Sequence, residues 1–587
     1  MMELKLPVWL DDTWVRNAAL AAAAAGTLSV LWRLSSSRRP LILADGKECV
    51  KDVADFPGPP LSGDNSLMSW KDELLSGDGK ACTFPLRWYE QFGGGKYVKF
   101  LSAAWPWWLK PFISVPPLVF CYDCKIARTL LVDGQQNYLP GHFFKRSDMA
   151  ANATETGFGR GSVISLRGPE WSAKRRILTP HFQLKVLYDS ALPYIQRCAE
   201  KIRAECEAAA KTETGLLRID PVFTSATMNV IMYLLFEEDV EYDTVTIQNG
   251  LNGILRYLAW THSTPFVQRT LGWWQAQRRL GAARDTVNSV LADRVRATMT
   301  AARQGPAEAI RGRGIVGLLA ASGKYTEDEI MAECRLLLTA GYDTTAHTLS
   351  FTVGMLAHDQ ATQEEARREA RELMPKGPTK ASLQSLEAGL INASFQEALR
   401  LFPVAPNVSG EVVHDLSVDG VRIRKGTLVQ FPTFTINRTN PSIASPEDFR
   451  PSRWLTKLGS EAGAKLKERE EMGENEKEDI SRAAAREEEP EKEDISFTLL
   501  SFSVGAHQCL GRQLAYLEAR AFLGTILKDF ELSPPPPEFW PEGSAGRRDT
   551  GLAGSEKVPI PSRVQWKEAT LLRPLEGMPL IVRRKAN

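Results

Sequence analysis

Residues 501–512, near the C-terminal end of the chain, read SFSVGAHQCLGR and surround Cys509 with glycines. Gly505 and Gly511 permit tight turns and let the backbone come close to a flat cofactor. A helix-like pattern follows from Leu514 to Phe530, so backbone N–H groups at its start can point at the sulfur and stabilise a thiolate. A thiolate opposite oxygen pushes electron density toward iron and favours cleavage of the O–O bond. The segment therefore predicts Cys509 as an iron ligand, although a single cysteine in a loop is more often a small buried residue.

A second informative segment is a long apolar helix that begins with the capping-box sequence TEDE at residues 326–329. It is apolar nearly all round, which indicates a buried helix, yet its centre reads AGYDTT at residues 340–345. Burying an aspartate and two threonines costs free energy unless these side chains find partners. One interpretation is that a threonine bonds back to the carbonyl four residues earlier. The interpretation that we favour is a polar notch at a ligand site, where Gly341 lets the ligand approach the helix.

Three further segments combine basic residues with aromatic or acidic ones. Trp171 and Arg175 lie one helical turn apart in WSAKR, and Glu397 and Arg400 share a helix face in EALRLFP. Downstream, residues 449–454 read FRPSRW and include Arg453. Each segment alone is weak evidence, because an acid–base pair three residues apart is worth only ~0.2–0.5 kcal/mol on a helix surface.

Taken together and in this order, the five segments resemble the cytochrome P-450 family of haem-thiolate monooxygenases, over about Phe56 to Arg584. The resemblance implies that Cys509 binds the haem iron and that Asp343 and Thr344 deliver protons. It gives a structural role, which is to fix the segment that presents the cysteine, to Glu397, Arg400 and Arg453. It implies haem contacts at Trp171, Arg175, Ala340, Gly341, Phe502, Gly505, His507, Cys509 and Gly511.

The chain departs from the family's usual pattern at three places. His507 stands where the family's loop usually has arginine, so its contact with a haem propionate would rest on a hydrogen bond without guaranteed charge. Ser452 replaces the acid of the family's P-E-R-F segment. The sequence at residues 145–148, 171–182 and 340–345 most resembles that of fatty-acid ω-hydroxylases and related lipid hydroxylases. Some of these attach haem through an acid where Ala340 stands here, so we expect no such ester.

The N-terminal segment predicts a membrane anchor. Asn17 to Trp32 carries no charge, and the basic residues Arg33, Arg38 and Arg39 follow it. A basic flank after an apolar segment predicts that the downstream domain faces the cytosol. A cleaved signal or an organelle transit peptide is the alternative, although the early acidic residues count against a transit peptide.

The domain organisation follows from these features and from composition. We expect an anchor with its basic flank at 1–39, a linker with a proline-rich hinge at 40–60, and one large haem domain at 61–587. Within that domain, 465–494 is a charged insertion and 534–561 is a Pro/Gly-rich loop. Helical periodicity dominates and strand patterns are few, so the predicted fold class is mainly α with small β-sheets. The net charge of +1 gives no basic field that would attract nucleic acid.

The resemblance implies insertion of one oxygen atom into a lipophilic substrate such as a fatty acid, sterol, terpenoid or carotenoid, with haem b as cofactor. No flavin or iron–sulfur motif is present, so electrons should come from NADPH through a separate flavoprotein reductase, with a cytochrome b-type protein as a second candidate donor. Arg512 is a candidate for docking that donor. The expected location is the endoplasmic reticulum membrane, with a plastid membrane as the alternative. Two other functions stay open: a reductase-independent peroxide isomerase or dehydratase, against which Thr344 argues, and a non-catalytic haem-binding protein.

Overall fold

The core of the protein is built around α13 (Glu327–His358), the helix that contains the AGYDTT segment. In this computed structural model the helix begins at the predicted capping box. The Thr326 hydroxyl accepts the Glu329 N–H at 3.3 Å, and the Glu329 carboxylate accepts the Thr326 N–H at 2.9 Å. From Ile330 to Ala357 every residue of α13 is buried except three at its centre. The prediction of a buried helix with an unusual middle is therefore confirmed.

The structure describes residues 82–95, 97–100, 118–134, 144–239, 242–263, 266–304, 314–455, 500–536, 566–568 and 571–585, together with 51–52, 56, 58–59, 69 and 564. The predicted anchor (1–39), the charged insertion (465–494) and most of the hinge and the Pro/Gly-rich loop lie outside these residues. The division into anchor, hinge and haem domain therefore stays a prediction.

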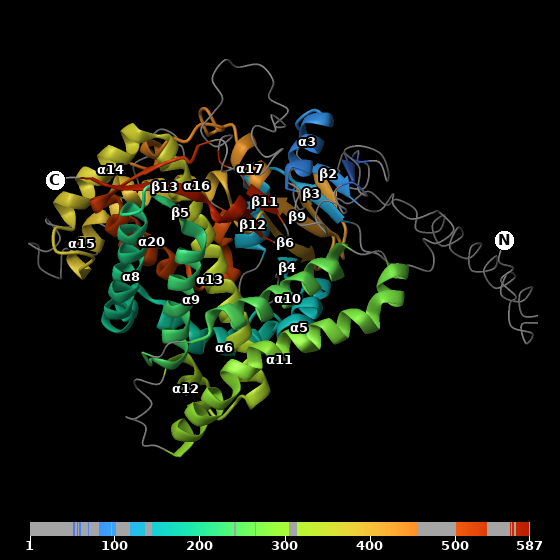
Figure 1. The fold of residues 1–587 in the computed structure, drawn as a ribbon. Helices are drawn as coiled ribbons and strands as arrows, with labels where there is room; N and C mark the ends of the chain where they lie inside the picture. The colour runs from blue at the N-terminus through green and yellow to red at the C-terminus, as the bar shows by residue number, and fades with distance from the viewer. Residues whose placement is uncertain are drawn as a thin grey trace, which may run out of the picture.

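Helices surround α13 on several sides (Figure 1). Among the described helices, those that pack on it most extensively are α9 (Ile219–Phe236), α11 (Phe266–Gln304), α16 (Leu390–Leu401) and α20 (Arg512–Asp529). The other helices are α3 (Thr83–Gln91), α4 (Cys124–Arg128), α5 (Asp148–Phe158), α6 (Gly168–Leu178), α7 (Leu184–Val186), α8 (Leu192–Ala210), α10 (Thr244–Ser263), α12 (Gly314–Ala321), α14 (Gln360–Leu373), α15 (Lys380–Ser385) and α17 (Thr433–Thr439).

The strands form small sheets, and the largest has the order β2-β3-β9-β6-β4. Figure 1 shows it on the side of the molecule away from α14 and α15. Its strands are β2 (Tyr97–Phe100), β3 (Leu118–Cys121), β4 (Phe144–Lys145), β6 (Asn407–Val412) and β9 (Leu428–Pro432). The smaller sheets, in the orders β1-β8-β7, β10-β13-β5 and β11-β12, contain β1 (Lys51–Asp52), β5 (Leu216–Arg218), β7 (Leu416–Val418), β8 (Val421–Ile423), β10 (Phe530–Ser533), β11 (Trp566–Glu568), β12 (Leu572–Pro574) and β13 (Pro579–Arg584).

The predicted class, mainly α with small β-sheets, is confirmed. Residues 416–423 form two strands, β7 and β8, which pair as an antiparallel hairpin. One π-helical turn, Leu187–Ala191, directly precedes α8. Among the described residues, one helix, α9, has the length and composition of a membrane span, but 67% of it is buried inside the protein and it packs on α13.

Candidate functional site

Cys509 lies in the loop between the short 3-10 turn η12 (Gly505–His507) and α20, as the sequence predicted. Burial raises the pKa of its thiol above the ordinary value, although backbone N–H groups of Gly511 and Arg512 and the guanidinium of Arg175 act in the opposite direction. Cys509 is exposed, although many protein atoms lie around it. A metal ion bound at the sulfur adds the positive charge that a buried thiolate needs.

The shape of this loop depends on Gly505. Its φ is +73°, and a Cβ built there would lie 2.0 Å from the carbonyl oxygen of Leu131, so only glycine fits. The loop closes through the Cys509 N–H, which donates to the Phe502 carbonyl oxygen at 2.9 Å. The Phe502 ring packs against Tyr516 of α20, with ring centroids 5.6 Å apart. Gly505 and Phe502, both predicted as haem contacts, therefore shape the loop that carries the cysteine.

His507 lies between an aromatic ring and a guanidinium. Its imidazole is 4.3 Å from the Trp171 ring, centroid to centroid, and its Nδ1 is 3.4 Å from Nη2 of Arg146. Burial lowers the pKa of His507 to about 3, and the charges of Arg146 and Arg175 act in the same direction. The imidazole is therefore neutral near pH 7, as the sequence suggested, and a proton on Nε2 leaves Nδ1 as the acceptor toward Arg146.

Helix α6 holds the cysteine loop from the other side. Trp171 is buried, and Arg175, one turn further, donates to the carbonyl oxygen of Gln508, the residue before Cys509. Burial lowers the pKa of Arg175, whereas the charge of Cys509 raises it, so the guanidinium lies within electrostatic reach of the sulfur. The structure thus brings together the predicted residues of the W-x-x-x-R segment and the cysteine loop.

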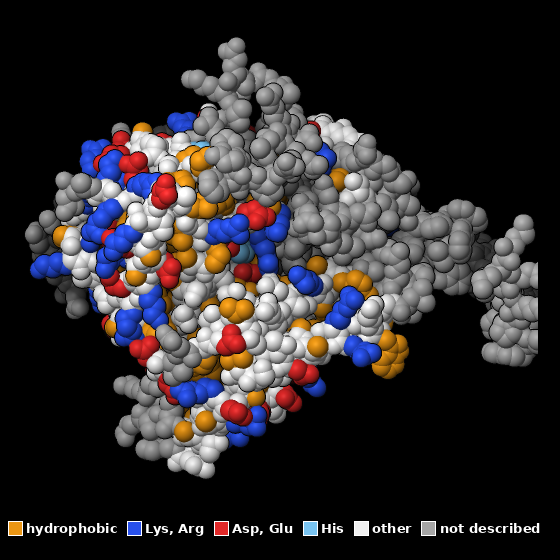
Figure 2. Space-filling model, in the orientation of Figure 1, with side chains coloured by type: hydrophobic (Ala, Val, Ile, Leu, Met, Phe, Trp, Pro, Cys, Tyr) orange, Lys and Arg blue, Asp and Glu red, His pale blue; other side chains and the backbone are white. Residues whose placement is uncertain are grey.

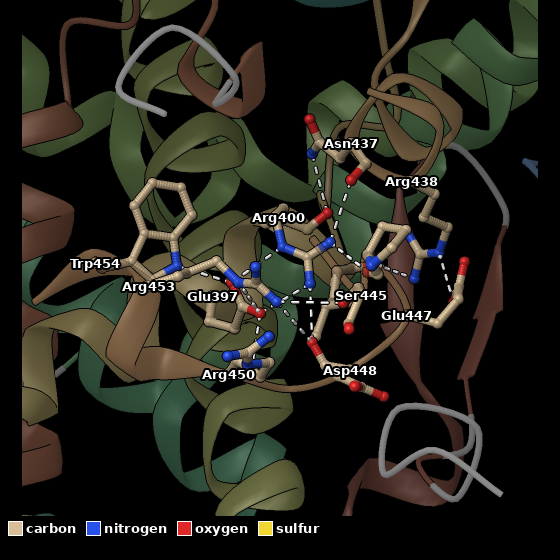
Figure 3. Close-up of polar contacts among 12 residues, drawn as sticks. Glu397, Arg400, Asn437, Arg438, Ser445, Glu447, Asp448, Arg450, Arg453 and Trp454 are labelled. Atoms are coloured by element: carbon tan, nitrogen blue, oxygen red, sulfur yellow. Dashed lines mark hydrogen bonds and ion pairs between the residues drawn. The ribbon is translucent and has the colours of Figure 1, made fainter. Parts of the chain in front are cut away.

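The three predicted structural residues meet in one buried network (Figure 3). Glu397 and Arg400, both fully buried, form a two-pronged pair with N···O distances of 3.0 and 2.8 Å. The Glu397 carboxylate also accepts Nε of Arg453 at 3.0 Å, the Arg450 N–H at 3.0 Å and the Trp454 indole N–H at 2.7 Å. Five donors therefore converge on one carboxylate.

This network connects α16 to the segment that follows α17. Arg400 donates to the carbonyl oxygens of Asn437, Pro446 and Asp448 at 2.6–3.1 Å. Burial alone raises the pKa of Glu397, but hydrogen bonds and charges from Arg400 and Arg453 outweigh it and hold the pKa below its ordinary value.

The cysteine loop is fixed to the same helix. The Ser501 hydroxyl donates to the carbonyl oxygen of Leu399 at 2.8 Å, between the two charged residues of the E-x-x-R pair. Helix α16 thus holds both the 437–454 segment and the start of the cysteine loop.

The centre of α13 is accessible on one side. Ala340 is exposed and Thr344 is half-buried, and these positions share a helix face because they are four residues apart. The Thr344 hydroxyl donates to the Ala340 carbonyl oxygen at 2.7 Å. The hydrogen bond from a threonine to the carbonyl four residues earlier, one of the two interpretations of this segment, is thus present. The hydroxyl oxygen keeps its lone pairs as acceptors on the accessible face.

Gly341 does not make room for a ligand in the way that we expected. A Cβ built there would lie 2.4 Å from side-chain atoms of Ile231 in α9. The missing side chain therefore permits close packing of α9 against α13. A backbone contact between Gly341 and haem stays a prediction.

Asp343 is buried and turned away from Thr344, because neighbouring helix positions face different directions. Its Oδ2 is 3.0 Å from Nη2 of Arg573, on β12, and its Oδ1 is 3.3 Å from Nε2 of His347. Arg573 also donates to the Asn252 side chain of α10 at 2.8 Å. The two predicted proton-delivery residues therefore lie in different surroundings.

Two arginines and a histidine of this region were not predicted as site residues. Arg146 lies in the KRSD segment at 145–148, which served only to suggest a family branch. Arg573 and His347 lie in no motif, and only the fold brings them to Asp343.

The residues around Cys509 fit a haem group. Cys509 is exposed in a loop that contains Gly505 and Gly511, Arg175 lies within electrostatic reach of the sulfur, and Arg146 lies beside the neutral His507 of the same loop. Basic donors of this kind suit the carboxylates of a haem edge. Among the described residues, no group of three His, Cys, Asp or Glu side chains is arranged to hold a metal ion.

Known proteins resemble this chain in sequence and in fold. The human mitochondrial sterol 26-hydroxylase is 28% identical over 327 residues, which cover 53% of this chain and 55% of that enzyme, so the chain matches about half of that relative's length. The human cytochrome P450 4X1 is 20% identical over 90% of this chain and 94% of its own. The crystal structure of the cytochrome P450DA heme domain shares the fold with a TM-score of 0.65 at 19% identity, over 90% of this chain and 98% of that one.

A family model extends this likeness to most of the chain. The model of cytochrome P450 matches residues 112–544, a span that includes α6, α13, α16 and the cysteine loop. The haem-binding geometry of the Cys509 loop lies within this match, and the chain belongs to the cytochrome P450 family.

Proposed function

We propose that this chain is a haem-thiolate monooxygenase that inserts one atom of O2 into a lipophilic substrate, with electrons from NADPH through a separate flavoprotein reductase. The observation that carries the proposal is the loop around Cys509, with two backbone N–H groups directed at an accessible sulfur. When bound, haem b supplies the reduction of oxygen and its insertion into a C–H bond. The chain supplies the sulfur ligand, the position of that ligand, and protons.

The positions of the haem-contact residues divide their roles. Cys509 would bind the haem iron, and Arg146, Arg175, Trp171 and His507 would contact the carboxylates of the cofactor. Arg146 joins this set because it contacts His507, which lacks the charge of the family's usual arginine. Gly505 packs the loop against Leu131, and Gly511 would let the backbone lie close to the cofactor.

Proton delivery is assigned to Thr344 and Asp343. The Thr344 hydroxyl lies on the accessible face of α13 and can accept or pass a proton there while bonded to Ala340. Asp343 is the nearest acid in sequence, and its carboxylate lies between a cation and an imidazole. We assign Asp343 to supplying protons through water to that face.

The substrate class and the membrane contact rest on different observations. One relative is named a sterol 26-hydroxylase and another a cholesterol side-chain cleavage enzyme, which supports a sterol or another lipid as substrate.

Trp273 and Trp274 on α11 are 46% and 75% exposed, and Arg278 and Arg279 one turn further are exposed as well. Figure 2 shows hydrophobic and basic side chains together where α11 projects from the body. Tryptophan and arginine at a surface favour an anionic membrane, so we place the catalytic domain at the cytosolic face of the endoplasmic reticulum.

Arg512 is suited to docking of the reductase. It is exposed at the first turn of α20, directly after the cysteine loop. A basic residue here can steer an acidic electron donor to the sulfur side of the haem.

The experiment that tests this function is a turnover assay of the haem-loaded protein with excess reductase and NADPH. Lipids that shift the Soret band on binding are chosen first as substrates. Hydroxylated product that depends on NADPH and O2 supports the proposal. Product from a lipid hydroperoxide without reductase would instead mean a peroxide isomerase, and haem binding without any turnover would mean a non-catalytic protein.

A further inference from the structure

A buried row of polar side chains extends from Asp343 into the contact between α13 and α9, two helices that lie side by side in Figure 1. His347 is one turn beyond Asp343 on the same face of α13, and its Nε2 is 3.3 Å from the Asp343 carboxylate. Its Nδ1 is 2.8 Å from Oδ1 of Asp220, in the first turn of α9. The same Asp220 oxygen accepts the Ser350 hydroxyl at 2.8 Å. One imidazole thus lies between two carboxylates from two helices: it shares a hydrogen bond with Asp220 and lies at ion-pair distance from Asp343.

These groups are enclosed by protein. His347 and Asp343 are each 4% exposed, and the side chain of Asp220 is 14% exposed. Burial alone lowers the pKa of His347, but the charges of Asp220 and Asp343 outweigh it and raise the pKa above its ordinary value. The other titratable groups that face this cluster are Arg573, whose charge opposes that rise, and Tyr342, whose own pKa is raised by burial and by Asp343.

The two oxygens of Asp343 are held by two different kinds of cation. Arg573 binds Oδ2 and stays charged at every pH at which the protein is folded. Nε2 of His347 lies 3.3 Å from Oδ1, an ion-pair distance rather than a hydrogen bond, and an imidazole is the side chain that gains or loses its charge near neutral pH. Only the contact with His347 can therefore change with pH in the range where an enzyme works.

We infer that His347, oriented by Asp220, is a positioning residue that fixes the Asp343 carboxylate for proton delivery. The inference rests on the proposed function, because it assigns support to the acid that the monooxygenase mechanism requires. The imidazolium places a positive charge 3.3 Å from Oδ1 of Asp343, and the hydrogen bond between Nδ1 and Asp220 keeps the ring in place. When His347 loses its proton, Asp343 is held by Arg573 alone and can turn toward that side.

The first test measures stability and needs no turnover. A histidine whose pKa is raised in the folded state contributes stability below its unfolded pKa of about 6.5, and this contribution is lost as pH rises through the folded pKa. The difference in melting temperature between the wild type and His347→Gln should therefore be largest near about pH 6 and should shrink toward about pH 9. Ser350→Ala is the matched control, because it removes a donor to the same Asp220 oxygen whose hydroxyl does not titrate in this range, and it should give a difference that varies little with pH.

The second test measures hydroxylated product per NADPH consumed, with reductase in excess, from about pH 6 to about pH 9. In the wild type this ratio should fall as His347 loses its proton. In His347→Gln and Asp220→Asn it should already be low at about pH 6, by roughly twofold to tenfold, as expected for the loss of one polar interaction of ordinary strength. It should also vary less with pH than in the wild type.

The Asp343→Asn variant distinguishes a failure of the positioning role of His347 from a failure of the proton-delivery role of Asp343. If Asp343→Asn lowers the ratio but His347→Gln leaves both the ratio and its pH profile like the wild type, the positioning role is wrong and the proposed function stands. If Asp343→Asn leaves the ratio unchanged, the proton-delivery role itself is wrong. A melting-temperature difference for His347→Gln that is constant across pH also overturns the inference, because His347 would then be a neutral packing residue.

Discussion

Replacing Glu397 by glutamine tests the network that positions the cysteine loop. The carboxylate accepts five donors through two oxygens, from Arg400, Arg450, Arg453 and Trp454. Glutamine keeps the shape of the side chain but replaces one oxygen by an NH2 group that is itself a donor. At least two of the five hydrogen bonds are lost, and Arg400 stays buried without the charge that balances it.

The size of the effect follows from burial. Arg400 and Glu397 are both 0% exposed, and breaking a buried ion pair by removing one partner typically costs about 3–5 kcal/mol. Three carbonyl oxygens still accept from Arg400, so we expect the lower half of that range. Because Ser501 bonds to Leu399 in the same helix, the disturbance should reach the cysteine loop and lower haem content.

The assay measures denaturant unfolding and Soret absorbance per mole of protein for Glu397→Gln. The matched control is Glu200→Gln, which makes the same chemical change in the exposed pair of Glu200 and Arg203, also three residues apart and 2.8 Å long. An exposed pair contributes at most about 1 kcal/mol, so the control should behave like the wild type. Equal stability and equal haem content in the two variants would refute the structural role of the network.

Three more changes test separate parts of the structure. Gly505→Ala should abolish stable haem binding, because the new methyl would lie 2.0 Å from the Leu131 carbonyl oxygen at a φ of +73°; normal haem content in this variant would mean that the loop has another shape. Thr344→Ala should leave haem binding intact but lower product per NADPH by about tenfold or more, with hydrogen peroxide formed instead, and an unchanged ratio would leave Thr344 as a back-bonded helix residue only. Deletion of residues 465–494 should leave the Soret spectrum unchanged, because charge-rich loops contribute little folding energy, and loss of haem would show that the segment is structural.

The sequence alone was sufficient to predict the fold class and most of the residues that gather around Cys509. Glu397 and Arg400 are three residues apart, and Trp171 and Arg175 are four apart, so helical geometry placed each pair on one face. The role of Arg453 came from the resemblance, and the structure places it within 3.0 Å of Glu397. The spacing of residues within a helix and the order of motifs along the chain are enough to predict such pairs.

Contacts between segments far apart in the chain could not be predicted from the sequence. Arg573 and Asp343 are 230 residues apart, and no local pattern relates a β12 arginine to the centre of α13. Gly341 shows a second limit of prediction from sequence. Its motif suggested space for a ligand, but whether a missing side chain serves a ligand or a neighbouring helix depends on the packing of α9, which one sequence does not specify.

The most direct test of the central claim is the spectrum of the reduced protein with carbon monoxide, for the wild type and for Cys509→Ala. A thiolate ligand gives the carbonyl complex a red-shifted band that imidazole or water does not produce. Cys124→Ala is the matched control, because this cysteine lies in α4 outside the loop and should be replaceable without change. The account predicts the red-shifted band in the wild type and in Cys124→Ala, and its absence in Cys509→Ala. Survival of that band in Cys509→Ala would mean that another residue holds the iron, which contradicts the account.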